Sequence, residues 1–242
     1  MKYPRILLSG DCSLVIEFGD SISEEINGEV RNFTNIIKTH NINGIVDMIP
    51  TFRSVLVNYD PRLIRFGDLK SILEKLLSEP LRKERKNGRR IVEIPVCYGG
   101  IYGPDLKDVV EYVSLTEEEV ISLHSSKDYL IYMLGFLPGF AYLGGMNSKL
   151  NIPRLLNPKI RIKAGSVAIG GAQTGIYPLD SPGGWRIIGR TPVKVYDPAR
   201  ENPILYRAGD YIRFVPIGEE KFLEIEEQEA KNQYSCRFED VN

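Results

Sequence analysis

The chain has 242 residues, of which 43% are hydrophobic, and its 31 basic and 32 acidic side chains leave a formal net charge of -1. This composition is typical of a globular protein with one large or two small domains, and it excludes a bulk attraction to nucleic acid or to an anionic membrane. The three cysteines are far apart, which argues against a secreted disulfide framework, and no apolar run reaches the roughly 18 residues of a membrane span. We therefore expect a cytoplasmic protein.

Residues 1–90 alternate between strand and helix patterns. Apolar residues at spacings of three and four predict a helix over residues 21–40, and Ser21 with Glu24 has the spacing of a capping box at its start. The same spacing predicts a second helix over residues 68–83. The predicted strands cover residues 13–18, 45–49, 55–59 and 91–96. Their order, β-α-β-β-α-β, predicts a ferredoxin-like domain.

The pattern changes after residue 98. Short helices are predicted to begin near Pro104 and at Thr116, where Glu119 completes a capping box. Between residues 129 and 215, short apolar runs separated by Gly and Pro favour an all-β barrel or sandwich. These runs are YLIYML, SVAIGG, RIIGR, VKVYD and YIRFV.

The end of the chain returns to helix composition at residues 219–231, and the remaining residues fit a strand, an arm or a disordered tail. We accordingly predict three parts. They are a ferredoxin-like α+β domain at residues 1–90, a β-barrel domain at residues 91–228 and a C-terminal tail at residues 229–242.

Two glycine-rich blocks, residues 134–145 and 164–191, stand out in the second half. Glycine is favoured where φ is positive or where another group approaches the backbone closely, so the blocks predict shaped backbone. The N–H groups of residues 170–175 form either an anion-binding nest or tight barrel turns. Charge for such a nest would come from Lys163, Arg186 or Arg190. Gln173 and Thr174 are polar in this small-residue turn, where structure requires them least, so they are its strongest candidates for a functional role.

The aromatic side chains near these blocks also allow two interpretations. Trp185, the only tryptophan, is either a core plug or a lid over a site. Residues 181–184 are either a turn or a binding loop. Four other rings either wall a pocket or fill the barrel, namely Phe136, Phe140, Tyr142 and Tyr177.

The number of histidines limits which metal and catalytic sites the chain can form, because only His40 and His124 are present. A three-histidine metal site is impossible, and neither a C-x-x-C pair nor an H-E-x-x-H helix occurs, so no metal site is predicted. The usual glycine motifs for nucleotide phosphates are also missing. His124 is interpreted as a helix-end residue, with a catalytic base as the alternative.

Four segments of the chain resemble one family. They are IPVCYGG from Ile94, HSSKDYLIYMLGFLPGFAYLGG from His124, AGSVAIGGAQTGIYPLDSPGGWRIIGRTP from Ala164 and RFVPI from Arg213. The family comprises the B subunit of prokaryotic 5-oxoprolinase, the kinase inhibitor KipI and the first half of the carboxyltransferase domain of urea carboxylase. The resemblance implies an α+β protein with a ferredoxin-like N-terminal domain followed by a cyclophilin-like β-barrel.

The resemblance also implies a function. The B subunit acts with the C and A subunits to open the lactam of 5-oxoproline to glutamate, using ATP with Mg²⁺ that is bound together with the partner subunit. Such a protein is expected to be inactive alone, and a homo-oligomer is a further expectation. The alternative is a KipI-like inhibitor that binds a sensor histidine kinase. A carboxyltransferase role is weakened because the chain has no M-K-M biotin-attachment motif.

The family's motif residues carry over to this chain by position. The residues implied to be catalytic are His124, Gln173 and Arg190, with Arg154 as the alternative anion contact. The residues implied to bind substrate are Phe140, Tyr142, Arg154, Gly165, Ser166, Thr174, Tyr177 and Trp185. Two positions depart from the family, since Ala141 and Lys163 stand where relatives usually carry proline, and this puts the shape of those loops in doubt.

Overall fold

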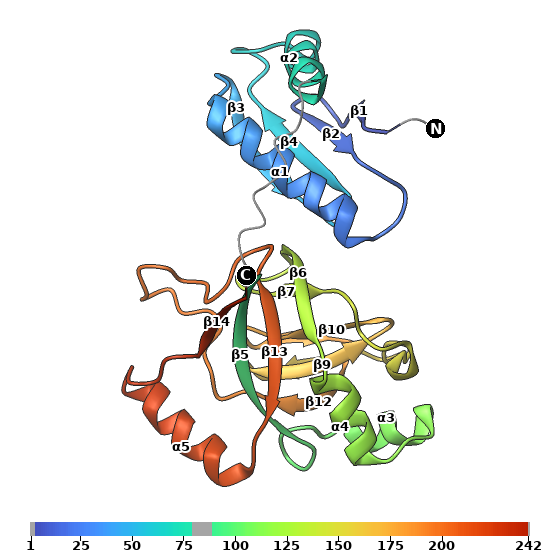
Figure 1. Ribbon diagram of the computed structural model, residues 1–242, viewed down its shortest axis with the longest axis vertical. Helices are drawn as coiled ribbons and strands as arrows, with labels where there is room; N and C mark the ends of the chain where they lie inside the picture. The colour runs from blue at the N-terminus through green and yellow to red at the C-terminus, as the bar shows by residue number, and fades with distance from the viewer. Residues whose placement is uncertain (1–2, 79–88, 242) are drawn as a thin grey trace. The chain divides into compact units, whose positions relative to one another are not determined.

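The computed structural model describes residues 3–78 and 89–241 and divides into two compact units, residues 1–87 and 88–242 (Figure 1). Each unit has a hydrophobic core of its own. Among the described residues, no helix combines the length and the apolar character that crossing a membrane requires.

The first unit is a four-stranded antiparallel sheet with two helices (Figure 1). Its elements are β1 (Arg5–Leu8), β2 (Ser13–Glu17), α1 (Glu24–His40), β3 (Ile45–Pro50), β4 (Ser54–Tyr59) and α2 (Phe66–Ser78). The strand order is β1-β2-β4-β3. Alternate residues of β2 and β4 are buried and pack with apolar residues of both helices, so the core lies between the sheet and the helices.

The predicted β-α-β-β-α-β order of this unit is wrong. Residues 91–96 belong to β5 (Arg89–Tyr98), which pairs with β12, β13 and β14 of the second unit. The edge beside β2 is occupied instead by β1, a strand that the sequence pattern did not predict. Most residues of β5 are buried, because a strand in the middle of a sheet is covered on both faces.

The helix boundaries of the first unit differ slightly from the prediction. Helix α1 is capped by Ser23 rather than Ser21, because the Ser23 hydroxyl accepts a hydrogen bond from the Ile26 N–H at 3.1 Å. Helix α2 begins at Phe66, and residues 79–83 of the predicted helix lie outside the described residues.

The second unit is built on a curved eight-stranded sheet (Figure 1). The elements of the second unit are β5, α3 (Leu106–Val113), α4 (Glu117–Ser125), β6 (Asp128–Leu134), β7 (Ala141–Leu143), the 3₁₀ turn η1 (Ser148–Leu150), β8 (Lys159–Ile162), β9 (Ser166–Gly170), β10 (Gln173–Ile176), β11 (Ser181–Gly183), β12 (Arg186–Arg190), β13 (Tyr211–Pro216), α5 (Glu219–Ala230) and β14 (Phe238–Val241).

This sheet is nearly closed into a barrel. Its order is β10-β9-β12-β5-β13-β6-β7, with β14 added beside β5, and its two end strands β7 and β10 lie against each other. Only β5 and β13 are parallel, and the other pairs are antiparallel. Apolar side chains from these strands and from α3, α4 and α5 fill the interior. The predicted barrel is therefore correct at the level of a mixed α+β unit, although the VKVYD run contributes only an isolated bridge from Tyr196 to Ile204.

The C-terminal segment is part of this unit rather than a separate tail. Residues 238–241 form β14 and pair antiparallel with the first half of β5. Arg213 on β13 holds this strand by hydrogen bonds to Glu239 at 2.5 Å and to Asp128 on β6 at 2.7 Å. The capping box predicted for α4 is confirmed, since Thr116 and Glu119 form both of its hydrogen bonds.

Candidate functional site

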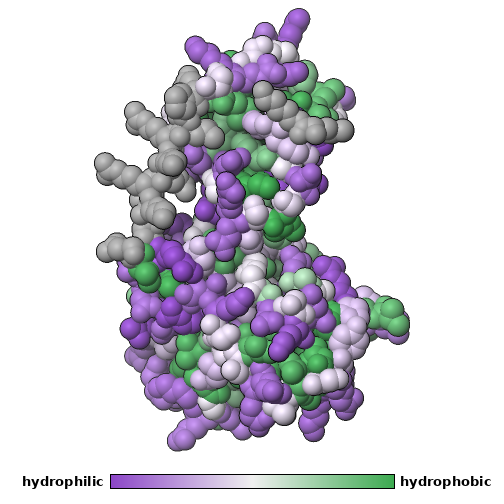
Figure 2. All heavy atoms as spheres, turned by 45° about the vertical axis from the view of Figure 1, so that its right-hand side comes forward, coloured by the Kyte–Doolittle hydropathy of each residue, from purple (hydrophilic) through white to green (hydrophobic). Residues whose placement is uncertain are grey.

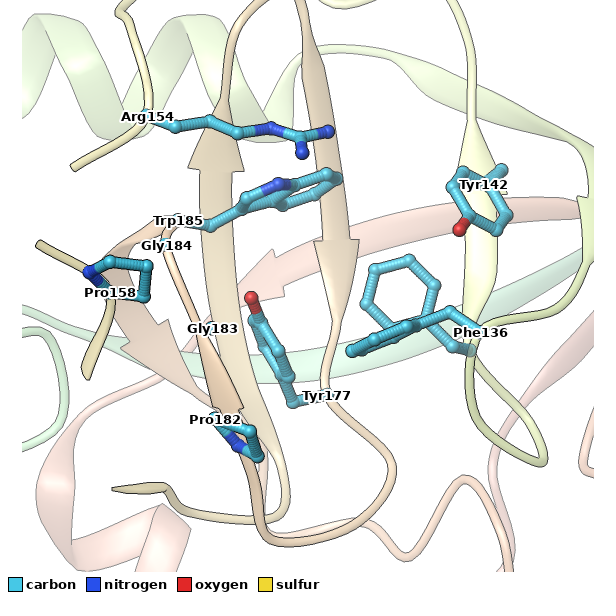
Figure 3. Close-up of a pocket in the computed structure, with 10 residues that line it drawn as sticks. Phe136, Tyr142, Arg154, Pro158, Tyr177, Pro182, Gly183, Gly184 and Trp185 are labelled. Atoms are coloured by element: carbon cyan, nitrogen blue, oxygen red, sulfur yellow. The ribbon is translucent and has the colours of Figure 1, made fainter. Parts of the chain in front are cut away.

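A cavity of about 310 Å³ opens on the second unit, beside the glycine-rich blocks (Figure 3). Its walls come from five chain segments: the β6–β7 loop, β7, the segment before β8, the residue that follows β10 and the region from β11 to β12. The lining residues are Phe136, Phe140, Tyr142, Arg154, Pro158, Tyr177, Pro182, Gly183, Gly184 and Trp185. Five of the residues implied to bind substrate are thus brought together in one place.

Phe140 forms the centre of an aromatic cluster in this pocket. Its ring meets four others edge-on, at interplanar angles between 65° and 85°. The centroid distances are 5.2 Å to Tyr142, 5.5 Å to Phe136, 5.6 Å to Tyr177 and 5.7 Å to Trp185. Edge-to-face contacts at these distances are favourable, so the buried rings hold one another in place.

Glycines in the second block, residues 164–191, make room for these rings. A Cβ on Gly170 would overlap the Trp185 ring, and one on Gly183 would overlap the Tyr177 hydroxyl. A Cβ on Gly175 would lie 3.3 Å from both Phe140 and Trp185. None of these three glycines has a positive φ, so close approach of a ring explains them rather than backbone conformation.

Arg154 supplies the positive charge of the pocket. Its guanidinium lies 5.7 Å from the centroid of the Trp185 ring, in a cation–π contact, and the side chain is exposed (Figure 3). Among the described residues, no carboxylate lies within 4 Å of the Arg154 guanidinium, because the acidic side chains that form ion pairs do so with other cations. The pocket therefore combines an apolar interior with one cation at its edge.

Tyr177 adds one hydroxyl to this apolar interior. Burial raises the pKa of Tyr177, while a hydrogen bond from the Trp185 backbone and the charge of Arg154 act in the opposite direction. The phenol therefore stays protonated at neutral pH and keeps a hydrogen to donate. An aromatic pocket that has the Tyr177 hydroxyl among its donors and one guanidinium at its edge suits a small, flat, anionic molecule that carries a carbonyl group.

His124 and Thr174 lie in the barrel core instead of the pocket. His124 is 0% exposed, and its ring stacks on Phe214 at 4.6 Å. Its Nδ1 pairs with the Tyr98 hydroxyl at 2.8 Å, and its Nε2 pairs with Thr174 Oγ1 at 2.7 Å. The Thr174 hydroxyl donates to the Ala168 carbonyl at 3.1 Å, so it accepts from Nε2–H, and Nδ1 accepts from Tyr98.

This network argues against the implied catalytic role of His124. Both ring nitrogens are occupied and no part of the side chain reaches the surface, so the ring has no atom to offer a substrate. Burial also lowers the pKa of His124 to about 3. The helix-end interpretation is nearer to the observed position, because His124 lies in the last turn of α4.

Three other implied residues, Arg190, Gly165 and Ser166, also lie outside the pocket lining. Arg190 donates from Nε to the Ala164 carbonyl at 3.1 Å, which leaves Arg154 as the arginine of the pocket. Gly165 has a φ of 82°, and a Cβ there would overlap the Thr191 carbonyl, so it serves a backbone turn. Ser166 is buried, and its carbonyl accepts a hydrogen bond from the Tyr177 N–H at 2.9 Å.

Of the two alternatives for residues 170–175, the structure shows the tight barrel turn rather than the anion-binding nest. These residues form the tight β9–β10 hairpin, in which Gln173 pairs with Gly170 and Gly171 has a φ of 66°. The Gly171 N–H donates to the Ile152 carbonyl at 2.7 Å and is therefore not free for an anion. Gln173 is half-buried at this hairpin and does not line the pocket.

Comparisons with known proteins show which family the chain belongs to. The sequence profile of the family described as carboxyltransferase domain, subdomain C and D, matches residues 4–206. The chain belongs to this family. It is 42% identical over 229 residues to the B subunit of 5-oxoprolinase from Bacillus subtilis, an alignment that covers 90% of this chain and 95% of that protein.

Solved structures that are similar to this chain include longer chains. TTHA0988 is 39% identical with a TM-score of 0.75, and the match covers 85% of this chain but only 40% of TTHA0988. The present chain thus spans about two fifths of that protein's length. The K. lactis urea amidolyase matches 98% of this chain and 16% of its own with a TM-score of 0.79, and its 20% identity shows the fold alone.

Sequence reasoning missed one part of the pocket of this family member. Pro158 lines the pocket, yet it lies in an irregular segment before β8 that has no periodicity, and it was not among the motif residues carried over. Two apolar side chains near it, Leu156 in this segment and Ile160 in β8, are 98% and 94% exposed, but their exposure is visible only in the folded structure. Apolar residues also reach the surface elsewhere on this unit, among hydrophilic ones (Figure 2).

Proposed function

We propose that this chain is the B subunit of an ATP-dependent 5-oxoprolinase and that its aromatic pocket binds 5-oxoproline. The observation that carries the proposal is the aromatic cluster around Phe140 with the unpaired guanidinium of Arg154 at its edge, in a chain 42% identical to a 5-oxoprolinase B subunit. The proposal includes the family's fold assignment, a ferredoxin-like first unit with an altered strand order and a cyclophilin-like barrel.

The chemistry of 5-oxoproline matches the pocket group by group. Its five-membered ring is nearly flat and has apolar edges, which suit the rings of Trp185 and Phe140. Its carboxylate would pair with Arg154, whose planar guanidinium can donate two parallel hydrogen bonds. Its lactam carbonyl would accept from the Tyr177 hydroxyl, which stays protonated because burial raises its pKa. These groups would bind and orient the lactam.

The remaining chemistry belongs, in this proposal, to the partner C and A subunits. A lactam is a poor electrophile, and ATP with Mg²⁺ supplies the phosphoryl group that makes its carbonyl carbon easier to attack by water. The described residues that line the pocket include no carboxylate, so this pocket does not fit Mg²⁺. We therefore assign the nucleotide and its metal to a site completed by a partner.

The test measures glutamate release from 5-oxoproline and ATP by the purified chain, alone and mixed with the C and A subunits. We expect no turnover alone and turnover in the mixture. Arg154→Gln should raise KM for 5-oxoproline about 10- to 100-fold with little change in kcat, because a charge-assisted hydrogen bond contributes about 1.5–3 kcal/mol. Arg161→Gln is the matched control, because Arg161 is an exposed arginine of the same unit that pairs with Asp180.

Two outcomes would contradict the proposal. If the complete mixture releases no glutamate and the chain instead lowers the autophosphorylation of a sensor histidine kinase, the inhibitor function replaces the enzymatic one. If the mixture is active but Arg154→Gln and Arg161→Gln behave like the unaltered chain, the substrate does not bind in this pocket.

A further inference from the structure

The loop between β6 and β7 has an unusual backbone at Phe136. This residue has a φ of 68°, and the Leu137 N–H donates to the Gly135 carbonyl at 2.8 Å. A hydrogen bond between residues two apart, across a residue with positive φ, defines the rare and strained form of the γ-turn. A bulky aromatic residue seldom adopts this conformation, whereas glycine does so at low cost.

The surrounding loop holds this turn in place. The Gly135 N–H donates to the Phe140 carbonyl at 3.1 Å, and the Phe140 N–H donates to the Leu137 carbonyl at 3.0 Å. The Gly139 carbonyl accepts from the hydroxyl of Tyr206 at 2.8 Å. Since Tyr206 and Phe140 are themselves buried, both arms of the loop are anchored in the barrel, and the strained residue has little freedom to relax.

The Phe136 side chain contributes little to the core that anchors its loop. The side chain is 61% exposed, and its described ring contact is the edge-on one with Phe140 at 5.5 Å. Two features are therefore unfavourable in the unliganded protein: the exposure of an apolar ring to water and the strained backbone that carries it. The ring nevertheless lines the pocket, and Figure 3 shows Phe136 and Trp185 entering it from different sides.

We propose that Phe136 is a specificity-determining residue that packs on the bound ring and limits its size. This inference rests on the proposed function of the pocket. The anchored turn presents the Phe136 ring at the mouth, so a flat five-membered lactam is held between this ring and the aromatic wall. A larger ring would have to displace Phe136, which the anchored loop resists. Ligand binding buries the exposed ring and offsets the unfavourable geometry of the free protein.

The experiment compares 5-oxoproline with its six-membered homologue, 6-oxopiperidine-2-carboxylate. Binding to the purified chain is followed by the fluorescence of Trp185, the only tryptophan, which lies in the pocket wall. KM values in the complete mixture give the same comparison for the assembled enzyme. The variants are Phe136→Gly, Phe136→Ala and Phe136→Tyr, with Ile101→Ala as the control, because Ile101 is an exposed apolar side chain outside the pocket.

Glycine separates a role of the ring from a role in stability. Phe136→Gly should leave the thermal midpoint of unfolding unchanged or raise it, because glycine adopts the positive φ without strain. Phe136→Gly and Phe136→Ala should both weaken 5-oxoproline binding about 5- to 20-fold and shift the preference toward the larger lactam by a similar factor. Phe136→Tyr and Ile101→Ala should retain the original affinity and preference.

Failures of the two proposals have different signatures. If the unaltered chain gives no fluorescence response and the complete mixture releases no glutamate, the proposed function itself is wrong. If the unaltered chain binds or turns over 5-oxoproline but the Phe136 variants keep its affinity and ring-size preference, the inference about Phe136 is overturned. The same conclusion follows if Phe136→Gly weakens binding and also lowers the thermal midpoint of unfolding, because the ring would then stabilise the fold.

Discussion

Lowering the pH from 7.5 to 5.0 should destabilise the second unit by about 2 kcal/mol through one side chain, His124. This histidine is 0% exposed and stacks on Phe214. Its neutral form is satisfied by the Tyr98 hydroxyl on one nitrogen and by Thr174 on the other. A proton added to Nδ1 would place a charge in the core and require the Tyr98 hydroxyl to accept where it now donates, and burial lowers the pKa of His124 to about 3.

The sign and size of the effect follow from the two pKa values. In the unfolded chain His124 has an ordinary pKa of about 6.5, so between pH 6.5 and pH 3 the unfolded state binds a proton that the folded state does not. The stabilisation is complete above pH 6.5 and is lost as the pH falls toward 3. Integration from pH 7.5 to 5.0 yields about 2 kcal/mol, which corresponds to a fall of roughly 4–8 °C in Tm for a domain of this size.

The assay is equilibrium urea unfolding followed by the fluorescence of Trp185, which reports on the second unit alone. The unaltered chain should lose about 2 kcal/mol more between pH 7.5 and 5.0 than His124→Gln, and His40→Gln should behave like the unaltered chain. NMR titration of the two histidines provides a second measurement that needs no variant. An equal loss of stability with and without His124, or a His124 resonance that titrates near pH 6.5, would refute the reasoning.

Two further predictions concern single residues of the second unit. Gly170→Ala should displace Trp185, because the new methyl group overlaps its ring, and should cost about 1–3 kcal/mol in urea unfolding together with a shift in Trp185 emission. Gly28→Ala in α1 is the control, because a Cβ there meets no atom within 4 Å, and it should be neutral or stabilising. A similar loss of unfolding free energy in both variants would contradict the packing argument. Thr116→Ala should cost about 1 kcal/mol by removing the cap of α4, whereas no change would mean that solvent replaces it.

The elements that the sequence predicted well depend on residues close together in the chain. The Thr116–Glu119 capping box spans one helical turn, and the apolar spacing in residues 24–40 repeats every turn, so local patterning is enough to predict both. The short apolar runs between Gly and Pro turns likewise indicated the barrel strands. The glycine-rich blocks indicated shaped backbone, and several of these glycines do lie against aromatic rings.

Only the tertiary structure decided which partners these elements meet. An apolar strand at residues 91–96 fits the edge of one sheet or the middle of another, and its pairing with β12 and β13 assigns it to the barrel. The family motif contains both His124 and Arg154, yet one is enclosed by residues 26 and 50 positions away and the other stands at the pocket edge.

The strained turn at Phe136 could not be recognised from the sequence either. Phenylalanine ordinarily avoids positive φ, so local preference predicts the opposite conformation, which hydrogen bonds across the loop and the distant Tyr206 impose. The sequence by itself therefore determined the local elements and the family, because these depend on near neighbours and on motifs. Burial, hydrogen-bond partners and strain depend on residues far apart in the chain, and those contacts exist only in the folded protein.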